Sequence, residues 1–290
     1  MKYVITGASG TLGRLVAEAT LEKADPADVV LVTRSPEKLS DLAARGADVR
    51  AGDFDDPASL ESAFSGGDRL LLISTDAVGE RVAGHRNAIN AAKEAGIGFI
   101  AYTSIINPIE DSPVGVNPDH FATENLLAES GLEYTALRNS VYSNMEVPSA
   151  QGAIATGKFV SNRGDGKIAF VSRDDCARAA AAVLVAEGPL ERAYDITGPE
   201  LIDGNDSARI FGQVGGVEVE YVDVDDETFI AGLIEHGVPE AAAPLYASFG
   251  IGIREGYAEV LSTAVEDLTG NPAESLETVL VRELAAAPAG

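Results

Sequence analysis

The sequence predicts an α/β fold in which a doubly wound parallel sheet is followed by a smaller C-terminal α/β lobe. Apolar, strand-like runs alternate with helix-periodic segments through the first half of the chain, which is typical of a parallel sheet with helices on both faces. A glycine-rich turn at residues 6–13 joins the first strand to the first helix. After residue 139 the segments become shorter and lie between turn signals. Together these observations predict a Rossmann-type domain with a smaller substrate lobe.

Six parallel strands account for the predicted sheet. They are expected at residues 3–5, 28–33, 47–51, 69–74, 98–103 and 133–138. The usual connectivity of this fold gives the spatial order 3-2-1-4-5-6. Further strands are predicted at residues 167–171, 193–197 and 217–222, and an alanine-rich helix is predicted over 172–187.

The predicted elements divide the chain into two parts. Residues 1–150 form the nucleotide-binding domain, whose sheet is partly completed by residues 151–200. Residues 201–290 form a mostly helical substrate lobe. Residues 285–290 read as a frayed tail.

The composition excludes several classes of partner. The chain has 290 residues, with 46 acidic against 21 basic side chains, and a net charge of −25. Nucleic acids and anionic membranes both require basic surfaces, so we expect neither as a partner. No apolar run reaches the roughly 18 residues that span a bilayer. The single cysteine, Cys176, cannot form an intrachain disulfide, and no signal peptide is recognisable, so we expect a cytoplasmic protein. The sequence leaves the oligomeric state open between a monomer and a homodimer.

The glycine turn predicts a dinucleotide site. Gly7 permits the tight turn, Gly10 lets the backbone approach a pyrophosphate, and Gly13 lets the helix pack closely on the strand. The free N–H groups at the start of the helix then face the anion. The cofactor-binding residues expected in this turn are Gly7, Ser9, Gly10, Thr11, Leu12 and Gly13. The alternative is a tight strand–helix turn without a ligand.

The end of the second strand indicates which nucleotide is bound. Thr33, Arg34 and Ser35 stand where an acidic residue would select NAD. A guanidinium there suits a 2′-phosphate, so we expect NADP(H) as the cofactor. Lys38, one turn further on, adds charge or is a solvated helix lysine.

Other strand ends are expected to contact the remaining parts of the cofactor, because ligands of this fold bind at the carboxyl ends of the strands. Asp53 and Phe54 follow the third strand, near the adenine, although Asp53 or a neighbour alternatively caps a helix. The other expected cofactor contacts at strand ends are Ser74, Thr75, Thr103 and Asn139.

Several motifs resemble one known group of proteins. TGASGTLG, VTRSPEKL, GDFDDP, AYTSI, ATENLLAESGLEYTALRN and YDITG are similar to the NmrA-like atypical short-chain dehydrogenase/reductases. Within that group the chain most resembles the NADPH-dependent quinone oxidoreductases and triphenylmethane dye reductases. The resemblance covers most of the chain and is weaker after residue 200. It implies a Rossmann domain, a small C-terminal substrate lobe and two-electron reduction without flavin.

The resemblance also shows where this chain departs from ordinary short-chain enzymes, which use a Ser together with a Tyr four residues before a Lys. Ser104 stands at the Ser position, but the Lys position holds His120 and the Tyr position holds Val116. Without that pair, alcohol oxidation is not expected. His120 is expected to contact the nicotinamide ribose or a quinone oxygen and to deliver a proton near neutral pH; alternatively, it faces solvent. His85 and His236 are expected to be structural or exposed.

The loop after the sixth strand is the third candidate region. The resemblance places Asn139, Tyr142 and Asn144 against the nicotinamide and the substrate. Tyr142 either stacks on a flat quinone or is a packed loop aromatic.

These observations lead to one main functional hypothesis and two others. The main one is NADPH-dependent hydride transfer to a quinone or a similar small, conjugated acceptor, with His120, Ser104 and Tyr142 as the candidate catalytic residues. A second hypothesis is an NADP-sensing regulator without turnover. A third keeps reduction but changes the substrate to a triphenylmethane or azo dye, or to a carbonyl compound.

Overall fold

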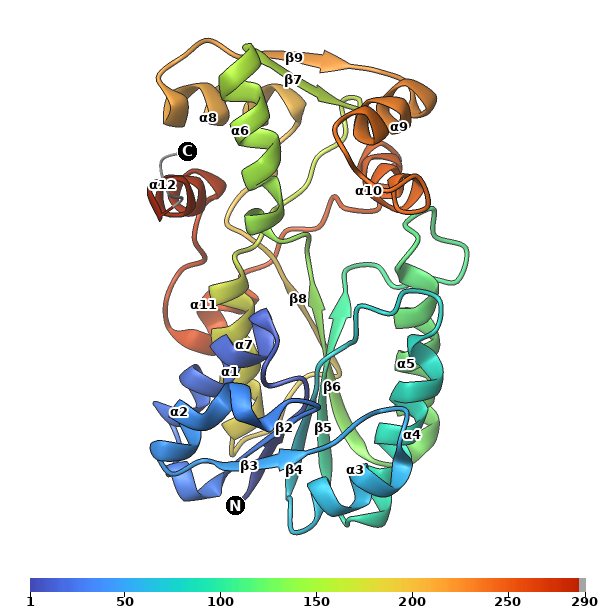
Figure 1. Cartoon of the computed structure of the whole chain (residues 1–290), viewed down its shortest axis with the longest axis vertical. Helices are drawn as coiled ribbons and strands as arrows, with labels where there is room; N and C mark the ends of the chain where they lie inside the picture. Colours follow the sequence, from blue (N-terminus) through green and yellow to red (C-terminus); the bar gives the residue numbers. More distant parts are fainter. Residues whose placement is uncertain (287–290) are drawn as a thin grey trace.

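The computed structural model, described here for residues 1–286, contains a seven-stranded parallel sheet in the order β3-β2-β1-β4-β5-β6-β8 (Figure 1). Its strands are β1 (Tyr3–Ile5), β2 (Val29–Thr33), β3 (Asp48–Ala51), β4 (Arg69–Leu72), β5 (Phe99–Ile105), β6 (Glu133–Asn139) and β8 (Ala193–Ile196). The predicted order is confirmed, and β8 extends the sheet beyond β6.

Helices cover both faces of this sheet, and the side-chain alternation of the strands explains why. In β4, Leu70 and Leu72 point to one face and Leu71 to the other, and all three are completely buried. One face carries α1 (Thr11–Leu21), α2 (Ser40–Ala44), α7 (Arg173–Val185) and α11 (Ala264–Thr269). The opposite face carries α3 (Pro57–Phe64), α4 (Arg81–Glu94) and α5 (Asn117–Ser130). Strands buried on both faces read as continuous apolar runs, as the sequence shows.

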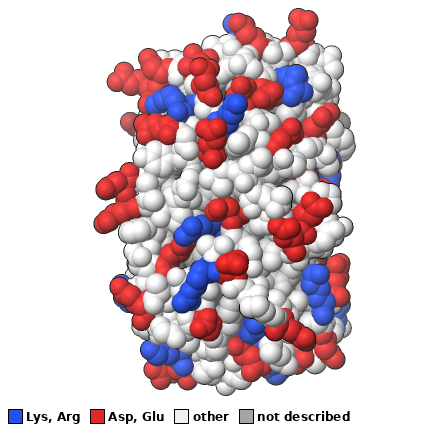
Figure 2. Space-filling model, turned by 180° about the vertical axis from the view of Figure 1, so that it is seen from behind, with Lys and Arg blue, Asp and Glu red and all other residues white. Residues whose placement is uncertain are grey.

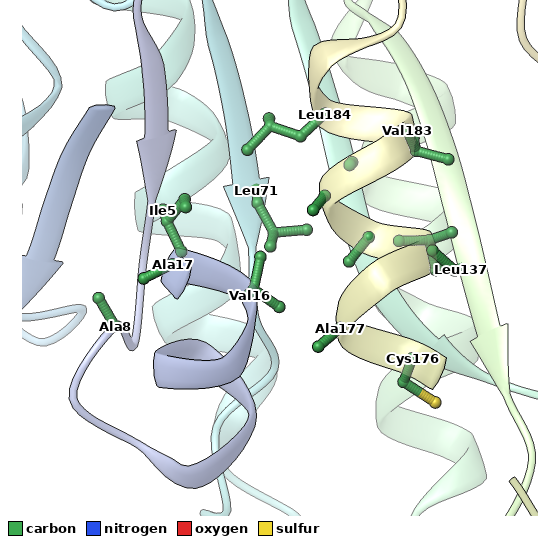
Figure 3. Packing of buried hydrophobic residues seen from close by; sticks show 14 of the residues in the cluster. Ile5, Ala8, Val16, Ala17, Leu71, Leu137, Cys176, Ala177, Val183 and Leu184 are labelled. Carbon is green, nitrogen blue, oxygen red and sulfur yellow. The ribbon is translucent and has the colours of Figure 1, made fainter. Parts of the chain in front are cut away.

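Small side chains let α1 and α7 pack closely over the centre of the sheet. Figure 3 shows Val16 of α1 pointing toward the side of α7 that carries Ala177, with Leu71 of the sheet between the two helices, whereas Ala17 lies beside Ile5. Cys176 is buried in the same cluster. Close packing here fixes α1, and with it the glycine turn, relative to the sheet.

The C-terminal lobe has a core of its own. The strands β7 (Lys158–Ser161) and β9 (Glu220–Asp223) form a two-stranded parallel sheet, which lies at the top of Figure 1. Around it lie α6 (Val147–Thr156), α8 (Gly204–Gly215), α9 (Asp226–Glu235), α10 (Ala243–Arg254) and α12 (Leu276–Ala286). Phe159 and Phe211 pack edge to face in its interior, with ring centroids 5.0 Å apart. Three short 3₁₀ turns, Pro26–Asp28, Pro36–Leu39 and Ser143–Glu146, complete the set of helical elements.

The structure corrects several predictions for the second half. Residues 167–171 are not a strand: Ile168 and Val171 form single bridges with different partners, Ile202 and Tyr142, because this segment crosses between the sheet and the lobe. The strand expected at 217–222 is β9, which begins later because the backbone N–H of Val217 still closes the end of α8.

The remaining predictions for this half have mixed outcomes. The strand β7 was not predicted. The frayed tail expected at 285–290 is wrong for residues 285–286, which continue α12, and its remaining residues lie outside the described part of the chain. The division into a 1–150 domain and a 201–290 lobe stays a prediction.

Carboxylates outnumber basic groups among the charged side chains, 46 to 21. In the face shown in Figure 2 they are spread over the whole height of the molecule, with Lys and Arg beside them in places. None of the helices within residues 1–286 combines the length and the apolar character that crossing a membrane requires.

Candidate functional site

A cleft of about 730 Å³ lies at the carboxyl ends of the central strands and is bordered by the C-terminal lobe through Met145 and Phe249. Its size and place match the ligand crevice of open α/β sheets. The predicted site residues that line it are Gly7, Ser9, Gly10, Thr11, Leu12, Gly13, Arg34, Lys38, Asp53, Phe54, Ser74, Thr75, Ser104, His120, Asn139 and Tyr142. Thr103 does not line it. The Thr103 hydroxyl lies behind the wall and accepts a hydrogen bond from the backbone N–H of Ser74 at 2.8 Å.

The glycine turn forms a cradle that only glycine permits. Gly7 has a left-handed backbone, with φ +61°. A Cβ on Gly13 would lie 2.1 Å from the carbonyl oxygen of Gly7, and one on Gly10 would lie 3.2 Å from the same atom. The first contact is far inside van der Waals distance, so α1 packs against the turn only with glycine at position 13.

The N-terminus of α1 is open toward the cleft. Gly10 is the N-cap, and no side chain caps this end of the helix. The first N–H groups of a helix have no partner within the helix, and the macrodipole adds a partial positive charge there. Thr11, Leu12 and Gly13 therefore present backbone donors suited to a pyrophosphate.

Two cations follow β2 at one end of the cleft. Arg34 and Lys38 are exposed, and neither forms an ion pair or a side-chain hydrogen bond with any residue in 1–286. Ser9 and Thr33 join hydroxyl to hydroxyl at 2.6 Å beneath them. The two free cations fit the 2′-phosphate expected from the sequence.

The structure shows which acidic residue after β3 caps a helix and which lies at the cleft. Asp56, not Asp53, caps α3, by accepting from the backbone N–H of Ser59. Asp53 accepts only from the backbone N–H of Asp55, at 3.2 Å, so its carboxylate stays at the cleft. The ring of Phe54 packs against α4, where Gly84 leaves room for it.

At the opposite end, two residues that line the cleft carry enclosed polar atoms without partners. Asn139 is 4% exposed and Ser140 is 3% exposed. The Oδ1 atom of Asn139 and the hydroxyl of Ser140 have no hydrogen-bond partner within the described chain. Buried polar groups are normally satisfied, so these two residues give this end of the cleft an unsatisfied polar character that suits a polar group such as a carboxamide.

His120 belongs to a buried hydrogen-bonded chain with Arg81 and Tyr102. Its Nε2 lies 3.0 Å from Nη1 of Arg81, and its Nδ1 lies 2.8 Å from the hydroxyl of Tyr102. A guanidinium only donates, so Nε2 accepts and the imidazole carries its proton on Nδ1. Burial, together with the charge of Arg81, lowers the pKa of His120 to about 3. The expectation that His120 delivers a proton near neutral pH is therefore wrong, although its ring does line the cleft.

His85 lies near His120 and contacts two neighbouring segments, at Thr123 and Thr75. It is completely buried, its Nδ1 lies 2.9 Å from the hydroxyl of Thr123, and its Nε2 accepts from the backbone N–H of Thr75 at 3.4 Å. Burial lowers the pKa of His85 to about 3 as well. The prediction of a structural or exposed residue is confirmed for His85, and His236 is exposed at the end of α9.

Ser104 and Tyr142 differ in the protons that they can offer. The Ser104 hydroxyl donates to Oε1 of Glu124 at 2.7 Å, and Arg138 pairs with the same carboxylate. The Tyr142 oxygen accepts from Nδ2 of Asn139 at 3.2 Å, and its own hydrogen has no acceptor among residues 1–286. Burial raises the pKa of Tyr142, so the phenol stays neutral. Among the three candidate catalytic side chains, Tyr142 therefore has the hydroxyl free to donate.

The structure adds residues that the sequence reasoning missed. The apolar wall near Tyr142 consists of Ile105, Val141, Met145 and Phe249. Two further cations, Arg81 and Arg173, also line the cleft. Arg173 lies over the ring of Tyr142, with its guanidinium carbon 5.3 Å from the centroid. Both arginines are the first residue of a helix, where the macrodipole disfavours a cation. A basic residue at the start of a predicted helix was therefore the sequence signal that could have identified Arg81 and Arg173 as site residues.

Comparison with known proteins fits this geometry. A sequence model of a family described as NAD(P)H-binding matches residues 7–187. The chain belongs to this family. The matched range includes the glycine cradle, Arg34 and Arg173, so the family's cofactor falls on the cleft described above.

The relatives are similar over almost the whole chain. Quinone oxidoreductase 2 of Escherichia coli (strain K12) is 39% identical over 272 residues, which are 94% of this chain and 95% of that protein. The E. coli NADPH-dependent quinone oxidoreductase, solved with NADPH, superposes with a TM-score of 0.93 at 38% identity, over 97% of this chain and 99% of that chain. The Citrobacter sp. triphenylmethane reductase, solved with NADP(H), gives a TM-score of 0.91 at 32% identity, over 97% and 99%. An NmrA-like oxidoreductase of Aspergillus flavus is 32% identical over 78% of this chain and 76% of its own. The resemblance inferred from the motifs is confirmed.

The glycine cradle gives a first prediction. Gly13→Ala should weaken NADPH binding strongly and lower the melting temperature, because its methyl group would collide with the carbonyl of Gly7. Gly98→Ala is the matched control, since a Cβ there meets nothing within 4 Å. Binding is measured by the change in NADPH fluorescence, and stability by thermal unfolding. Unchanged binding in Gly13→Ala would contradict the close approach.

The two buried histidines give a second prediction, about pH. Their pKa values of about 3 in the folded protein lie below the roughly 6.5 of an unfolded histidine. Between these values the unfolded chain binds more protons, so this part of the stability is complete above about pH 6.5 and is lost as the pH falls toward 3.

Replacing one of these histidines should therefore flatten the pH dependence. Urea unfolding at pH 7 and pH 5 should show a smaller loss of unfolding free energy for His120→Asn than for the wild type. His236→Asn, at an exposed site, should keep the wild-type difference. The same loss in all three proteins would show that His120 is not held neutral.

Proposed function

We propose that this protein is an NADPH-dependent reductase that passes hydride directly to a quinone or a similar flat, conjugated acceptor, without flavin. The observation that carries the proposal is the likeness to the E. coli quinone oxidoreductase over 97% of the chain, which includes the C-terminal lobe as well as the nucleotide-binding part. The lobe borders the cleft through Phe249, so the likeness extends to the acceptor side of the site.

The residues of the cleft fit NADPH. Arg34 and Lys38 would hold the 2′-phosphate, the N-terminus of α1 would hold the pyrophosphate, and Asn139 with Ser140 would lie at the carboxamide end. When bound, the cofactor supplies a hydride from its nicotinamide ring. The protein's part is to bind, to orient and to exclude water.

The acceptor side favours a quinone over an ordinary ketone. The Tyr and Lys positions of ordinary short-chain enzymes hold Val116 and His120 here. His120 is neutral near neutral pH, and its one ring proton is directed at Tyr102 instead of the acceptor. A quinone is a strong electrophile, and its reduced oxygen is a phenolate, which is a far weaker base than an alkoxide. The phenolate can therefore form first and take its proton from water afterwards, while Tyr142 donates a hydrogen bond. Met145 and Phe249 give the flat ring an apolar contact.

A second reductase activity follows from the same shape. Triphenylmethane and azo dyes are also conjugated hydride acceptors, and a triphenylmethane reductase shares 32% identity with this chain. We also propose a cytoplasmic location, where NADPH is supplied. The assembly, monomer or homodimer, can be measured by light scattering.

The decisive measurement is turnover by purified protein. With NADPH, 1,4-benzoquinone and no added flavin, NADPH oxidation followed at 340 nm should exceed the uncatalysed rate and scale with protein concentration. A panel that includes a triphenylmethane dye and an azo dye orders the acceptors. Tight NADPH binding without reduction of any acceptor would refute the reductase and support the NADP-sensing regulator.

Arg34 should decide between the two nicotinamide cofactors. Arg34→Ala should raise the Kd for NADPH by about 10- to 150-fold, because a hydrogen bond to a charged group is worth about 1.5–3 kcal/mol, and it should leave the Kd for NADH nearly unchanged. Arg45→Ala, at an exposed arginine outside the cleft, is the control. If Arg34→Ala weakened NADH binding equally, Arg34 would contact a part that both cofactors share.

A further inference from the structure

Arg81 is a buried cation in the wall of the cleft, and part of its guanidinium is uncommitted. Its side chain is 5% exposed. Nη1 donates to His120 at 3.0 Å, and Nε lies 3.4 Å from a carboxylate oxygen of Asp119. Nη2 has no hydrogen-bond partner among residues 1–286. It is also not one of the buried polar atoms of these residues that are closed off from solvent and left without a partner. A donor that is neither paired nor sealed off inside a cleft wall is available to a ligand.

The neighbours of Arg81 leave its positive charge directed at the cleft. Arg81 and His120 line the cleft, but Asp119 does not. That carboxylate is also occupied by the backbone N–H of Gly79, at 2.6 Å. The ring of His120 is neutral and accepts from Arg81, so it orients the guanidinium without adding charge of its own. The carboxylate that pairs with Arg81 therefore lies behind the wall, and the two nearby carboxylates that do line the cleft, Asp76 and Glu80, form no ion pair with Arg81 in residues 1–286.

The position of Arg81 separates it from the groups that fit the cofactor phosphates. Arg34 follows β2, whereas Arg81 contacts His120, which in turn contacts Tyr102 of β5. In the order β2-β1-β4-β5 the strand that carries Tyr102 lies three strand spacings from β2, or roughly 14 Å at about 4.8 Å each. The N-terminus of α1 lies between the two cations, above β1. Arg81 is thus on the far side of the pyrophosphate position from Arg34, at the end where the acceptor is reduced.

We propose that Arg81 is the charge-stabilising residue of the reaction, and that its free Nη2 contacts the acceptor oxygen on which negative charge develops. The proposal rests on the reductase function proposed above. One hydride brings two electrons and one proton to the quinone, NADPH becomes NADP⁺, and the former carbonyl oxygen becomes a phenolate. A fixed guanidinium stabilises that oxygen without moving a proton, and water supplies the second proton after the hydride has arrived.

Binding of a product-like anion tests this without turnover. At one fixed pH of 8.5, 4-nitrophenolate is an anion, and 4-nitroaniline is a neutral molecule of nearly the same shape. The wild-type protein with NADP⁺ bound should prefer the phenolate. Arg81→Gln should lose that preference by about ten- to a hundredfold, as expected for a charge-assisted hydrogen bond, and Arg81→Lys should keep part of it. Arg86→Gln, an exposed arginine of the same helix, is the matched control.

Kinetics with a series of substituted benzoquinones gives the second readout. The loss of kcat/KM in Arg81→Gln should grow as the quinone becomes a weaker acceptor, because weaker electrophiles depend more on stabilisation of the oxygen, and the Kd for NADPH should stay unchanged. If Arg81→Gln left a buried carboxylate unpaired and did not fold, the double variant Arg81→Gln with Asp119→Asn would remove both charges and keep the test open.

The outcomes separate this proposal from the proposed function. An unchanged phenolate preference in Arg81→Gln would overturn the proposed role of Arg81. A weaker NADPH affinity with an unchanged phenolate preference would also overturn it and would place Arg81 in the cofactor site. Failure of the wild-type protein to reduce any acceptor would refute the reductase function itself, and the phenolate preference would still report whether Arg81 binds an anion.

Discussion

The contact between α1 and the turn at Gly7 is the constraint on which the rest of the site depends. A Cβ at position 13 would lie 2.1 Å from the carbonyl of Gly7, so the helix sits directly on the turn. That contact points the N-terminus of α1 at the centre of the sheet's carboxyl edge, and α7 packs on the other side of α1 through small side chains (Figure 3). The position of Arg173, at the start of α7, is therefore fixed relative to the same edge. The close approach of α1 to the turn thus determines the positions of two separate parts of the cleft, the N-terminus of α1 and Arg173.

The electrostatics of the cleft differ from those of the whole protein. A net charge of −25 repels a polyanionic cofactor at a distance, but salt screens exposed charges beyond roughly 8 Å. Inside the cleft the nearest groups dominate, and there four cations, Arg34, Lys38, Arg81 and Arg173, balance four carboxylates, Asp53, Asp55, Asp76 and Glu80, so the cleft does not share the acidic excess of the whole protein. Two of these cations occupy first positions of helices, where the helix dipole adds to their positive potential instead of opposing it. Such an arrangement is unfavourable in the absence of an anion, which is why it marks a place where negative charge is bound or develops.

Much of the fold and part of the site could be predicted from the sequence because local patterns determine them. Continuous apolar runs located the first six strands, the usual connectivity of the fold predicted their order, the glycine spacing predicted the cradle, and Arg34 predicted the cofactor type. The properties of His120 could not be predicted in this way. They depend on Arg81, which is 39 residues away in the sequence and only 3.0 Å away in space. Likewise, β7 was missed because its partner β9 begins about sixty residues later, and a four-residue strand has no periodicity of its own to reveal it.

The neutral state of His120 helps to explain how the site differs from that of an alcohol dehydrogenase. A reaction that forms an alkoxide needs a proton as the charge develops, because an alkoxide is a strong base. A reaction that forms a phenolate needs only a stable positive environment until water protonates the oxygen. A buried arginine meets that need, because its guanidinium supplies positive charge without giving up a proton. The buried pair of Arg81 and Asp119 has a large desolvation penalty, and an apolar pair would often be at least as stable. The retention of a charged pair in the wall of the cleft, with the cation toward the ligand and the carboxylate behind it, is therefore better explained by the chemistry of an anionic product than by stability.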